Sequence, residues 1–199
     1  MTRLTVEDRR EEILRATVTQ IAERGVAAIR VADVATALGV STALVFYHFR
    51  SKDRLVAEAF GYAARRDLDR LAEVAEAGGT ARQRLVRALR LYHPSGSAAP
   101  GWRLWIDGWS AALREPELRR VCRRLDLRWR DTIAGLIAEG VAAGEFGCAD
   151  PQAAAWRITA LIDGLSVQTT VHRGVLTRRR AEAWAYEQAA RELGLAALF

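Results

Sequence analysis

The sequence predicts an all-α protein of about nine helices, in which a small N-terminal unit of three helices precedes a larger helical body. Apolar residues recur at steps of three and four in almost every segment, and no stretch alternates as a strand would. Glycine, proline and short polar clusters fall between these segments and divide the chain into separate helices. At 199 residues the chain is long enough for a small unit joined to a larger one.

The composition is that of a globular protein, since 50% of the residues are hydrophobic and 27% are charged. The formal net charge of +6 is compatible with a polyanionic partner but does not demand one. Cys122 and Cys148 do not form a CxxC pair, so neither a zinc site nor a disulfide framework is expected. The charged N-terminus has no apolar signal segment, and no long apolar run follows. We therefore expect a cytoplasmic protein with no membrane partner, no metal and no cofactor.

The first expected helix covers residues 6–24 and ends at Gly25. Thr5 and Asp8 have the spacing of a capping pair at its start. The residues expected on its buried face are Leu14, Val18, Ile21 and Ala22.

Two short helices follow, over residues 31–38 and 42–49. Gly39 supplies the turn between them, where a Cβ would be costly, and Ser41 can cap the second helix. Two short helices joined in this way form a helix-turn-helix pattern. The small and apolar positions that allow them to cross closely are Val34, Ala35, Leu38, Val40 and Val45.

The remaining segments extend the helical pattern to the end of the chain. We expect a long helix over residues 51–77 with Ser51 as its cap, another over 80–93, and a loop over 94–101. Four more helices are expected over residues 102–115, 116–144, 150–174 and 177–195. Pro116 and Pro151 both stand where the first turn of a helix accepts proline.

The second short helix of the hairpin carries residues suited to DNA. If it lies in the major groove, Thr42, Ala43 and Leu44 in its first turn face the base edges. Tyr47 and His48 can donate hydrogen bonds to phosphates. At this point the alternative that these two side chains only pack against the protein stays open.

The run "VADVATALGVSTALVFYHFRSKDRLVAEAF" resembles the DNA-binding domain of the TetR family of bacterial transcriptional regulators. The matching elements are Asp33-Val34-Ala35, Gly39-Val40-Ser41, Tyr47-His48-Phe49 and Ser51-Lys52-Asp53. The stretch from "ELRRVCRRLDLRWRD" onward is similar to the C-terminal domains of the branch that includes the betaine-pathway repressor. The resemblance implies a helix-turn-helix DNA-binding domain over residues 1–50 and a helical ligand-binding and dimerisation domain over 51–199.

Two positions depart from the family pattern. Many relatives carry Ser or Thr where this chain has Arg30, which can contact a phosphate but cannot cap a helix, and many carry Tyr where it has Phe46. Lys52, the only lysine in the chain, adds a cation at the start of the long helix. The predicted DNA-binding residues are Arg30, Ser41, Thr42, Ala43, Leu44, Tyr47, His48 and Lys52.

The body contains a candidate binding site for a small molecule. Trp102, Trp105 and Trp109 share one face of a helix, and their rings can hold an aromatic or apolar ligand, or a cation. Ordinary core packing is the alternative for each of these rings. Asp107 is expected to pair with an arginine at the surface. The predicted ligand-binding residues are Tyr92, Trp105, Trp109, Trp129 and Asp163.

A polar stripe in the penultimate helix consists of Thr159, Asp163, Ser166 and Thr170. Because an unpaired buried carboxylate is costly, Asp163 needs an arginine, a subunit partner, water or a ligand. The sequence leaves open whether the stripe faces a ligand or a second subunit. By the resemblance, the last two helices form a homodimer interface that includes Trp156, Leu161, Leu165, Trp184, Tyr186, Ala190 and Leu193.

These features predict a homodimeric transcriptional repressor that binds a palindromic operator in double-stranded DNA and is released by a small-molecule effector of unknown identity. A DNA-binding architectural protein without an effector is the first alternative. An all-helical enzyme is the second, but the glycine-rich, P-loop and HExxH motifs are missing, and the three histidines are scattered. We therefore expect that the protein is not an enzyme.

Overall fold

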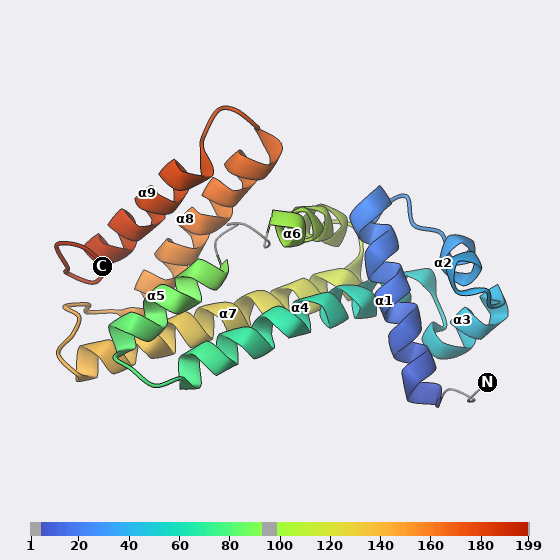
Figure 1. Ribbon diagram of the computed structural model, residues 1–199, viewed down its shortest axis with the longest axis horizontal. Helices are drawn as coiled ribbons and strands as arrows, with labels where there is room; N and C mark the ends of the chain where they lie inside the picture. Colours follow the sequence, from blue (N-terminus) through green and yellow to red (C-terminus); the bar gives the residue numbers. More distant parts are fainter. Residues whose placement is uncertain (1–4, 93–98, 199) are drawn as a thin grey trace. The chain divides into compact units, whose positions relative to one another are not determined.

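The structure is a computed structural model that describes residues 5–92 and 99–198. Within these residues the chain forms nine helices and no strand, which confirms the all-α prediction (Figure 1). The helices are α1 (Val6–Arg24), α2 (Val31–Leu38), α3 (Thr42–Phe49), α4 (Lys52–Glu76), α5 (Ala81–Tyr92), α6 (Ala99–Ala112), α7 (Pro116–Ala142), α8 (Pro151–Val171) and α9 (Arg178–Glu192).

The described residues divide into two compact units. The first contains residues 5–66 and 103–125, and therefore α1, α2, α3 and parts of α4, α6 and α7. The second contains residues 67–92, 99–102 and 126–198, and therefore α5, α8, α9 and the remaining parts of α4, α6 and α7.

Helix α1 begins with the predicted capping box. The backbone N–H of Asp8 donates to Thr5 Oγ1 at 3.0 Å, while Thr5 N–H donates to the Asp8 carboxylate at 3.2 Å. The predicted buried face is partly wrong, because Val18 is half-buried and Ala22 is exposed. The residues that α1 buries are Ile13, Leu14, Thr17 and Ile21. Thr17 can take an interior position because its hydroxyl donates to the Ile13 carbonyl at 2.7 Å.

Helix α6 packs within the first unit through a glycine and a tryptophan. A Cβ on Gly108 would lie 2.4 Å from the Phe60 ring, so only glycine allows this approach. The rings of Phe60 and Trp105 meet edge to face, with centroids 5.0 Å apart. Among the described residues, Asp107 does not have the arginine partner expected from the sequence. Its carboxylate instead accepts a hydrogen bond from the backbone N–H of Val26.

The second unit is built around the pair α8 and α9, which lie side by side and run antiparallel (Figure 1). Small residues allow close approach, and those buried on the two helices include Ala154, Ala155, Ala181, Ala185 and Ala189. Pro151 stands in the first turn of α8 as predicted, with Asp150 as the cap. The buried hydroxyls of Thr159 and Ser166 donate to the carbonyls four residues earlier, at 2.8 and 2.6 Å.

One predicted boundary is wrong. The loop expected over residues 94–101 ends earlier, because α6 already begins at Ala99, and residues 94–98 lie outside the described part of the chain. None of the helices in the described ranges is by itself long and apolar enough to cross a membrane. The pair α2 and α3 passes that test together by length and composition, but it is bent by 113°.

Candidate nucleic-acid interface and ligand site

The turn between α2 and α3 has helix-turn-helix geometry. Gly39 adopts φ +64° and ψ 32°, a left-handed conformation that costs a glycine little, and Val40 N–H donates to the Ala35 carbonyl at 3.0 Å. Apart from its chain neighbours, no atom of the described residues lies within 4 Å of a Cβ built on Gly39, so the backbone conformation rather than space requires glycine. The bend of 113° between the two helices lies in the range of helix-turn-helix pairs.

Helix α3 has one buried and one exposed face. Val45 and Phe49 are buried at 1% and 0% exposure, whereas Thr42, Ala43 and Tyr47 are exposed, Tyr47 at 74%. Ser41 caps the helix as predicted, because its hydroxyl accepts the backbone N–H of Leu44 at 3.2 Å. The exposed face also includes Phe46, at 43% exposure. Within the first unit, Thr42 and Tyr47 stay accessible to solvent.

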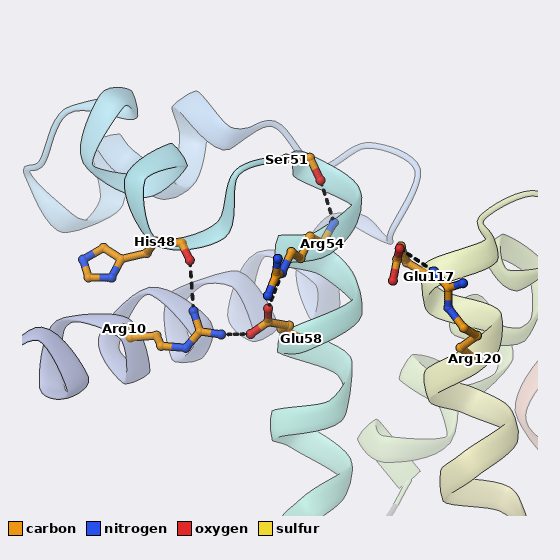
Figure 2. Close-up of polar contacts among 7 residues, drawn as sticks. All are labelled: Arg10, His48, Ser51, Arg54, Glu58, Glu117 and Arg120. Carbon is orange, nitrogen blue, oxygen red and sulfur yellow. Dashed lines mark hydrogen bonds and ion pairs between the residues drawn. The ribbon is translucent and has the colours of Figure 1, made fainter.

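A brace that sequence reasoning missed holds the last turn of α3. Arg10 in α1 donates from Nη1 to the carbonyl oxygen of His48 at 3.1 Å (Figure 2). Its guanidinium also lies 4.5 Å from the centre of the Phe49 ring. Arg10 also forms an ion pair with Glu58 in α4, and Glu58 accepts Arg54 Nε at 2.9 Å. The brace therefore connects α1, α3 and α4 and fixes the end of α3.

The turn between α3 and α4 is strained. Arg50 adopts φ +63° and ψ −35°, and no other non-glycine residue in the described ranges has positive φ. Ser51 N–H donates to the Phe49 carbonyl at 2.7 Å, which closes a tight γ-turn around Arg50. A non-glycine residue in such a conformation costs about 1–2 kcal/mol. Ser51 Oγ then accepts Arg54 N–H at 3.1 Å and starts α4, as the sequence predicts.

Three further predicted DNA residues lie around α3. Arg30 is the exposed N-cap of α2 and forms no side-chain cap hydrogen bond, as expected for arginine. Lys52 is half-buried at the start of α4 and lines a first-unit pocket of about 320 Å³. The His48 ring is also half-buried and meets the Tyr47 ring edge to face, with centroids 5.3 Å apart. Burial, and secondarily the charges of Arg10 and Arg9, lower the pKa of His48 below 6.5.

If His48 contacts a phosphate as the sequence predicts, its lowered pKa makes DNA binding depend on pH. Unbound His48 is neutral at neutral pH, and a nearby phosphate would raise its pKa, so binding takes up a proton. DNA affinity should therefore rise as the pH falls from about 7.5 to about 5.5 at constant salt. Fluorescence anisotropy measures this dependence. His48→Gln should flatten it, and an equally steep dependence in that variant would assign the proton to another group.

The second unit gathers two tryptophan rings around Tyr92. The Tyr92 ring meets Trp129 and Trp102 edge to face, with centroid distances of 4.9 and 5.9 Å. The Trp102 indole N–H donates to the Tyr92 carbonyl at 3.1 Å. The Tyr92 hydroxyl donates to Asp163 Oδ1 at 2.7 Å, which brings three of the five predicted ligand residues together.

A buried arginine organises the carboxylates beside these rings. Arg130, at 7% exposure, pairs with Asp126, lies 3.8 Å from Asp163 Oδ2 and donates Nε to Thr159 Oγ1 at 3.2 Å. Its guanidinium covers the Trp156 ring at 3.8 Å from the ring centre. Two carboxylates thus surround one guanidinium, which leaves a formal charge of −1. The sequence contained one signal, the i,i+4 spacing of Asp126 and Arg130.

The protonation of Asp163 reflects this environment. Burial raises the pKa of Asp163 to about 6, and the Asp126 charge acts in the same direction. The hydrogen bond from Tyr92 and the charge of Arg130 oppose the rise. Burial also raises the pKa of Tyr92 well above 10, so this hydroxyl remains a donor at neutral pH.

The other two predicted ligand residues belong to the first unit. Trp105 packs against Phe60, and Trp109 lies beside Trp105 with ring centroids 5.9 Å apart. Both rings are half-buried. In this unit they serve as packing side chains, and a role in binding a ligand stays a prediction.

Comparison with known proteins assigns the chain to a family. Residues 81–194 match the C-terminal domain of BetI-type transcriptional repressors, and residues 13–59 match the bacterial regulatory proteins of the tetR family. The chain belongs to the TetR family. It is similar to the transcriptional regulator BetI of Stenotrophomonas maltophilia (strain R551-3), with 30% identity over 195 residues that cover 96% of this chain and 95% of the relative.

Solved structures of TetR-like regulators share the fold. A transcriptional regulator from Saccharomonospora viridis, solved in complex with choline, is 31% identical with a TM-score of 0.82, over 91% of this chain and 95% of the relative. A TetR-family regulator from Rhodococcus sp. is 30% identical with a TM-score of 0.78, over 94% of this chain and 100% of the relative. The protein is thus a BetI-like TetR-family repressor, and its family points to transcription regulation rather than to an enzyme.

The predicted dimer residues of this TetR-family protein fall into two classes. Trp156 and Trp184 are exposed at 48% and 42%, and Leu161 is half-buried. The others are buried within the single chain, namely Leu165, Tyr186, Ala190 and Leu193. Only the first class presents apolar surface that a second subunit can cover.

Proposed function

We propose that the protein is a homodimeric repressor that binds a palindromic operator through α3 and is released by a small-molecule effector. The observation that carries the DNA-binding part is the two-sided character of α3, with Val45 and Phe49 buried and Thr42 and Tyr47 exposed. A helix that buries one face against its own unit and exposes the other can enter a major groove without rearrangement. α3 is called the recognition helix below.

The proposed contacts divide by position along the recognition helix. Thr42, Ala43 and Leu44 at its first turn are the proposed base readers. Phosphate contacts are proposed for the residues around them, namely Arg30, Ser41, Tyr47, His48 and Lys52. We propose that residues 1–50 act as the DNA-binding domain and 51–199 as the ligand-binding and dimerisation domain, in the cytoplasm with the DNA.

A homodimer is proposed because one recognition helix contacts too few bases to be selective. Two helices related by a two-fold axis can enter successive major grooves about 34 Å apart, which requires a palindromic operator. The exposed Trp156 and Trp184 on α8 and α9 support an interface there, since large exposed apolar side chains on neighbouring helices favour association. In this proposal Leu161 joins them, and the four buried residues form the layer beneath.

The proposed effector is a quaternary ammonium compound of the choline class. Choline is bound by the relative from Saccharomonospora viridis. In this chain the rings of Tyr92 and Trp129 next to Asp163, in a cluster of net negative charge, provide the groups that recognise such a cation. The polar stripe from Thr159 to Thr170 is thereby proposed to face the ligand at Asp163. We also propose that Trp105 and Trp109 contribute to effector binding.

Release would follow if the effector binds better to a form whose recognition helices are wrongly spaced for adjacent grooves. The coupling between effector and DNA would then be about 1–3 kcal/mol, or roughly 5- to 150-fold in DNA affinity. An architectural protein without an effector would show no such coupling.

Fluorescence anisotropy with the DNA upstream of the protein's own gene tests this function. The protein should bind operator-sized fragments more tightly than random DNA, and choline should weaken that binding. Thr42→Ala should change the ranking of operator variants, whereas Tyr47→Phe should weaken binding to all sequences alike. Equal affinity for upstream and random DNA would contradict the proposal, and an unchanged ranking with Thr42→Ala would contradict the assignment of base readers.

A further inference from the structure

The three basic residues that follow the recognition helix have different environments. Arg54 donates to Glu58 and completes the brace (Figure 2). Lys52 is half-buried along a pocket whose lining carries three carboxylates. Arg50 is exposed, and its side chain has no hydrogen bond or ion pair to any residue in the ranges 5–92 and 99–198. Of the three, only Arg50 is exposed and without a hydrogen bond or ion pair to those ranges.

Arginine is an unfavourable choice for the backbone at this position. The φ of +63° favours glycine, or asparagine, because a Cβ crowds the backbone there. The γ-turn closed by Ser51 N–H and the Phe49 carbonyl holds Arg50 in this conformation. Within the described part of the chain no contact of its side chain offsets this cost, so the guanidinium is expected to act on a partner outside the chain.

The neighbours of Arg50 indicate the partner. Tyr47, one turn earlier, is exposed on the DNA-facing side of the recognition helix. Arg10 holds the His48 carbonyl two residues before Arg50, so the place where the side chain leaves the protein is fixed. A guanidinium beside a helix that enters the major groove meets the phosphate backbone, which it can bind with two parallel hydrogen bonds.

We propose that Arg50 is a further DNA-contact residue, whose guanidinium binds a backbone phosphate at the edge of the groove that the recognition helix enters. This inference rests on the proposed DNA-binding function and adds a residue to it. In this proposal the strained turn directs this cation to the phosphate. The contact is independent of base sequence.

The salt dependence of binding tests Arg50 directly. Each phosphate that a protein neutralises contributes about 0.9 to the slope of log affinity against log salt concentration. Arg50→Gln keeps the Cβ and a polar side chain, although a shorter one, and removes the charge. It should lower the slope by about 0.9 for each recognition helix bound, and it should weaken operator and random DNA alike, by about 3- to 10-fold per helix.

Three variants serve as controls. Arg50→Lys keeps the charge and should keep the slope close to that of the wild type. Arg120→Gln makes the same change in net charge at an exposed arginine that pairs with Glu117 in α7, and should leave the slope unchanged (Figure 2). Arg50→Gly removes both the charge and the backbone strain. It should lower the slope without lowering the midpoint of thermal unfolding, which shows that lost binding is not lost folding.

The outcomes separate this inference from the proposed function. If the wild type binds its upstream DNA in a salt-dependent manner and Arg50→Gln has the same slope, the Arg50 assignment is overturned and the proposed function stands. If the wild type shows no salt-dependent binding at all, both are overturned. A lower active fraction from poor folding reduces affinity by the same factor at every salt concentration and leaves the slope unchanged.

Discussion

Replacing Arg130 with methionine should lower the free energy of unfolding by about 3–5 kcal/mol. Arg130 is buried, pairs with Asp126 and Asp163, and donates to the Thr159 hydroxyl. Methionine fills part of the volume but leaves two carboxylates without their cation in a region of low polarity. Urea-induced unfolding, followed by far-ultraviolet circular dichroism at pH 7, measures the loss.

Two variants define the origin of this loss. Arg120→Met removes an arginine that pairs with Glu117 at the surface, and should change stability by less than about 0.5 kcal/mol. Combining Arg130→Met with Asp163→Asn should recover part of the loss, because one of the two stranded carboxylates is then neutral. A loss below about 1 kcal/mol for Arg130→Met would show that the carboxylates remain solvated and that Arg130 is not their essential partner.

Asp163→Asn should lower the affinity for the proposed quaternary ammonium effector by about tenfold or more and should largely abolish the release of DNA by that effector. The amide oxygen can still accept the Tyr92 hydroxyl, which donates to Asp163 Oδ1 at 2.7 Å. The change therefore removes a charge and keeps the hydrogen bond. Titration calorimetry measures effector binding, and anisotropy measures release.

A neutral ligand of the same shape supplies the control for Asp163. The neutral isostere of choline, in which a tert-butyl group replaces trimethylammonium, should bind weakly to the wild type and to Asp163→Asn alike. If the cation loses no more affinity than the isostere on going to Asp163→Asn, the carboxylate does not recognise the charge.

The raised pKa of Asp163 should make effector binding at this carboxylate depend on pH. Because this pKa is about 6, the carboxylate is mostly ionised at pH 7 and mostly protonated at pH 5. Effector affinity should therefore fall as the pH is lowered from 7 to 5. The folded-state pKa lies above the unfolded value, and the unliganded protein therefore loses stability as the pH rises from about 4 through about 6. Asp163→Asn should remove both dependences.

Much of the fold could be predicted from local signals. The capping box of Thr5 and Asp8, the Ser41 cap and the Gly39 turn act over at most four residues, and the structure has each of them where the sequence predicts it. Prolines at the start of α7 and α8 gave their boundaries for the same reason. The beginning of α6 was missed, because its first residues have the composition of a loop.

The sequence indicated which residue types to consider for the candidate sites, but it did not indicate which residues contact one another. Arg10 meets a carbonyl 38 residues away, and Asp107 meets a backbone N–H 81 residues away. These separations are far longer than the three or four residues that join neighbours on one helix, so no local pattern in the sequence predicts either contact. Trp105 and Trp109 share a helix with Trp102, yet they pack in the first unit while the Trp102 ring meets Tyr92 in the second.

The sequence by itself determined the nine helices of the described chain, the helix-turn-helix and the family, because helix caps, turn glycines and periodic burial depend on residues within one or two helical turns. Only the tertiary structure decided that Arg130 pairs with Asp163 and that Arg10 holds the end of the recognition helix. It also decided that Arg50 lies in a strained turn with its side chain exposed. Asp163 and the His48 carbonyl lie on other helices than the arginines that they meet, and only the packing of the chain brings these groups within contact distance.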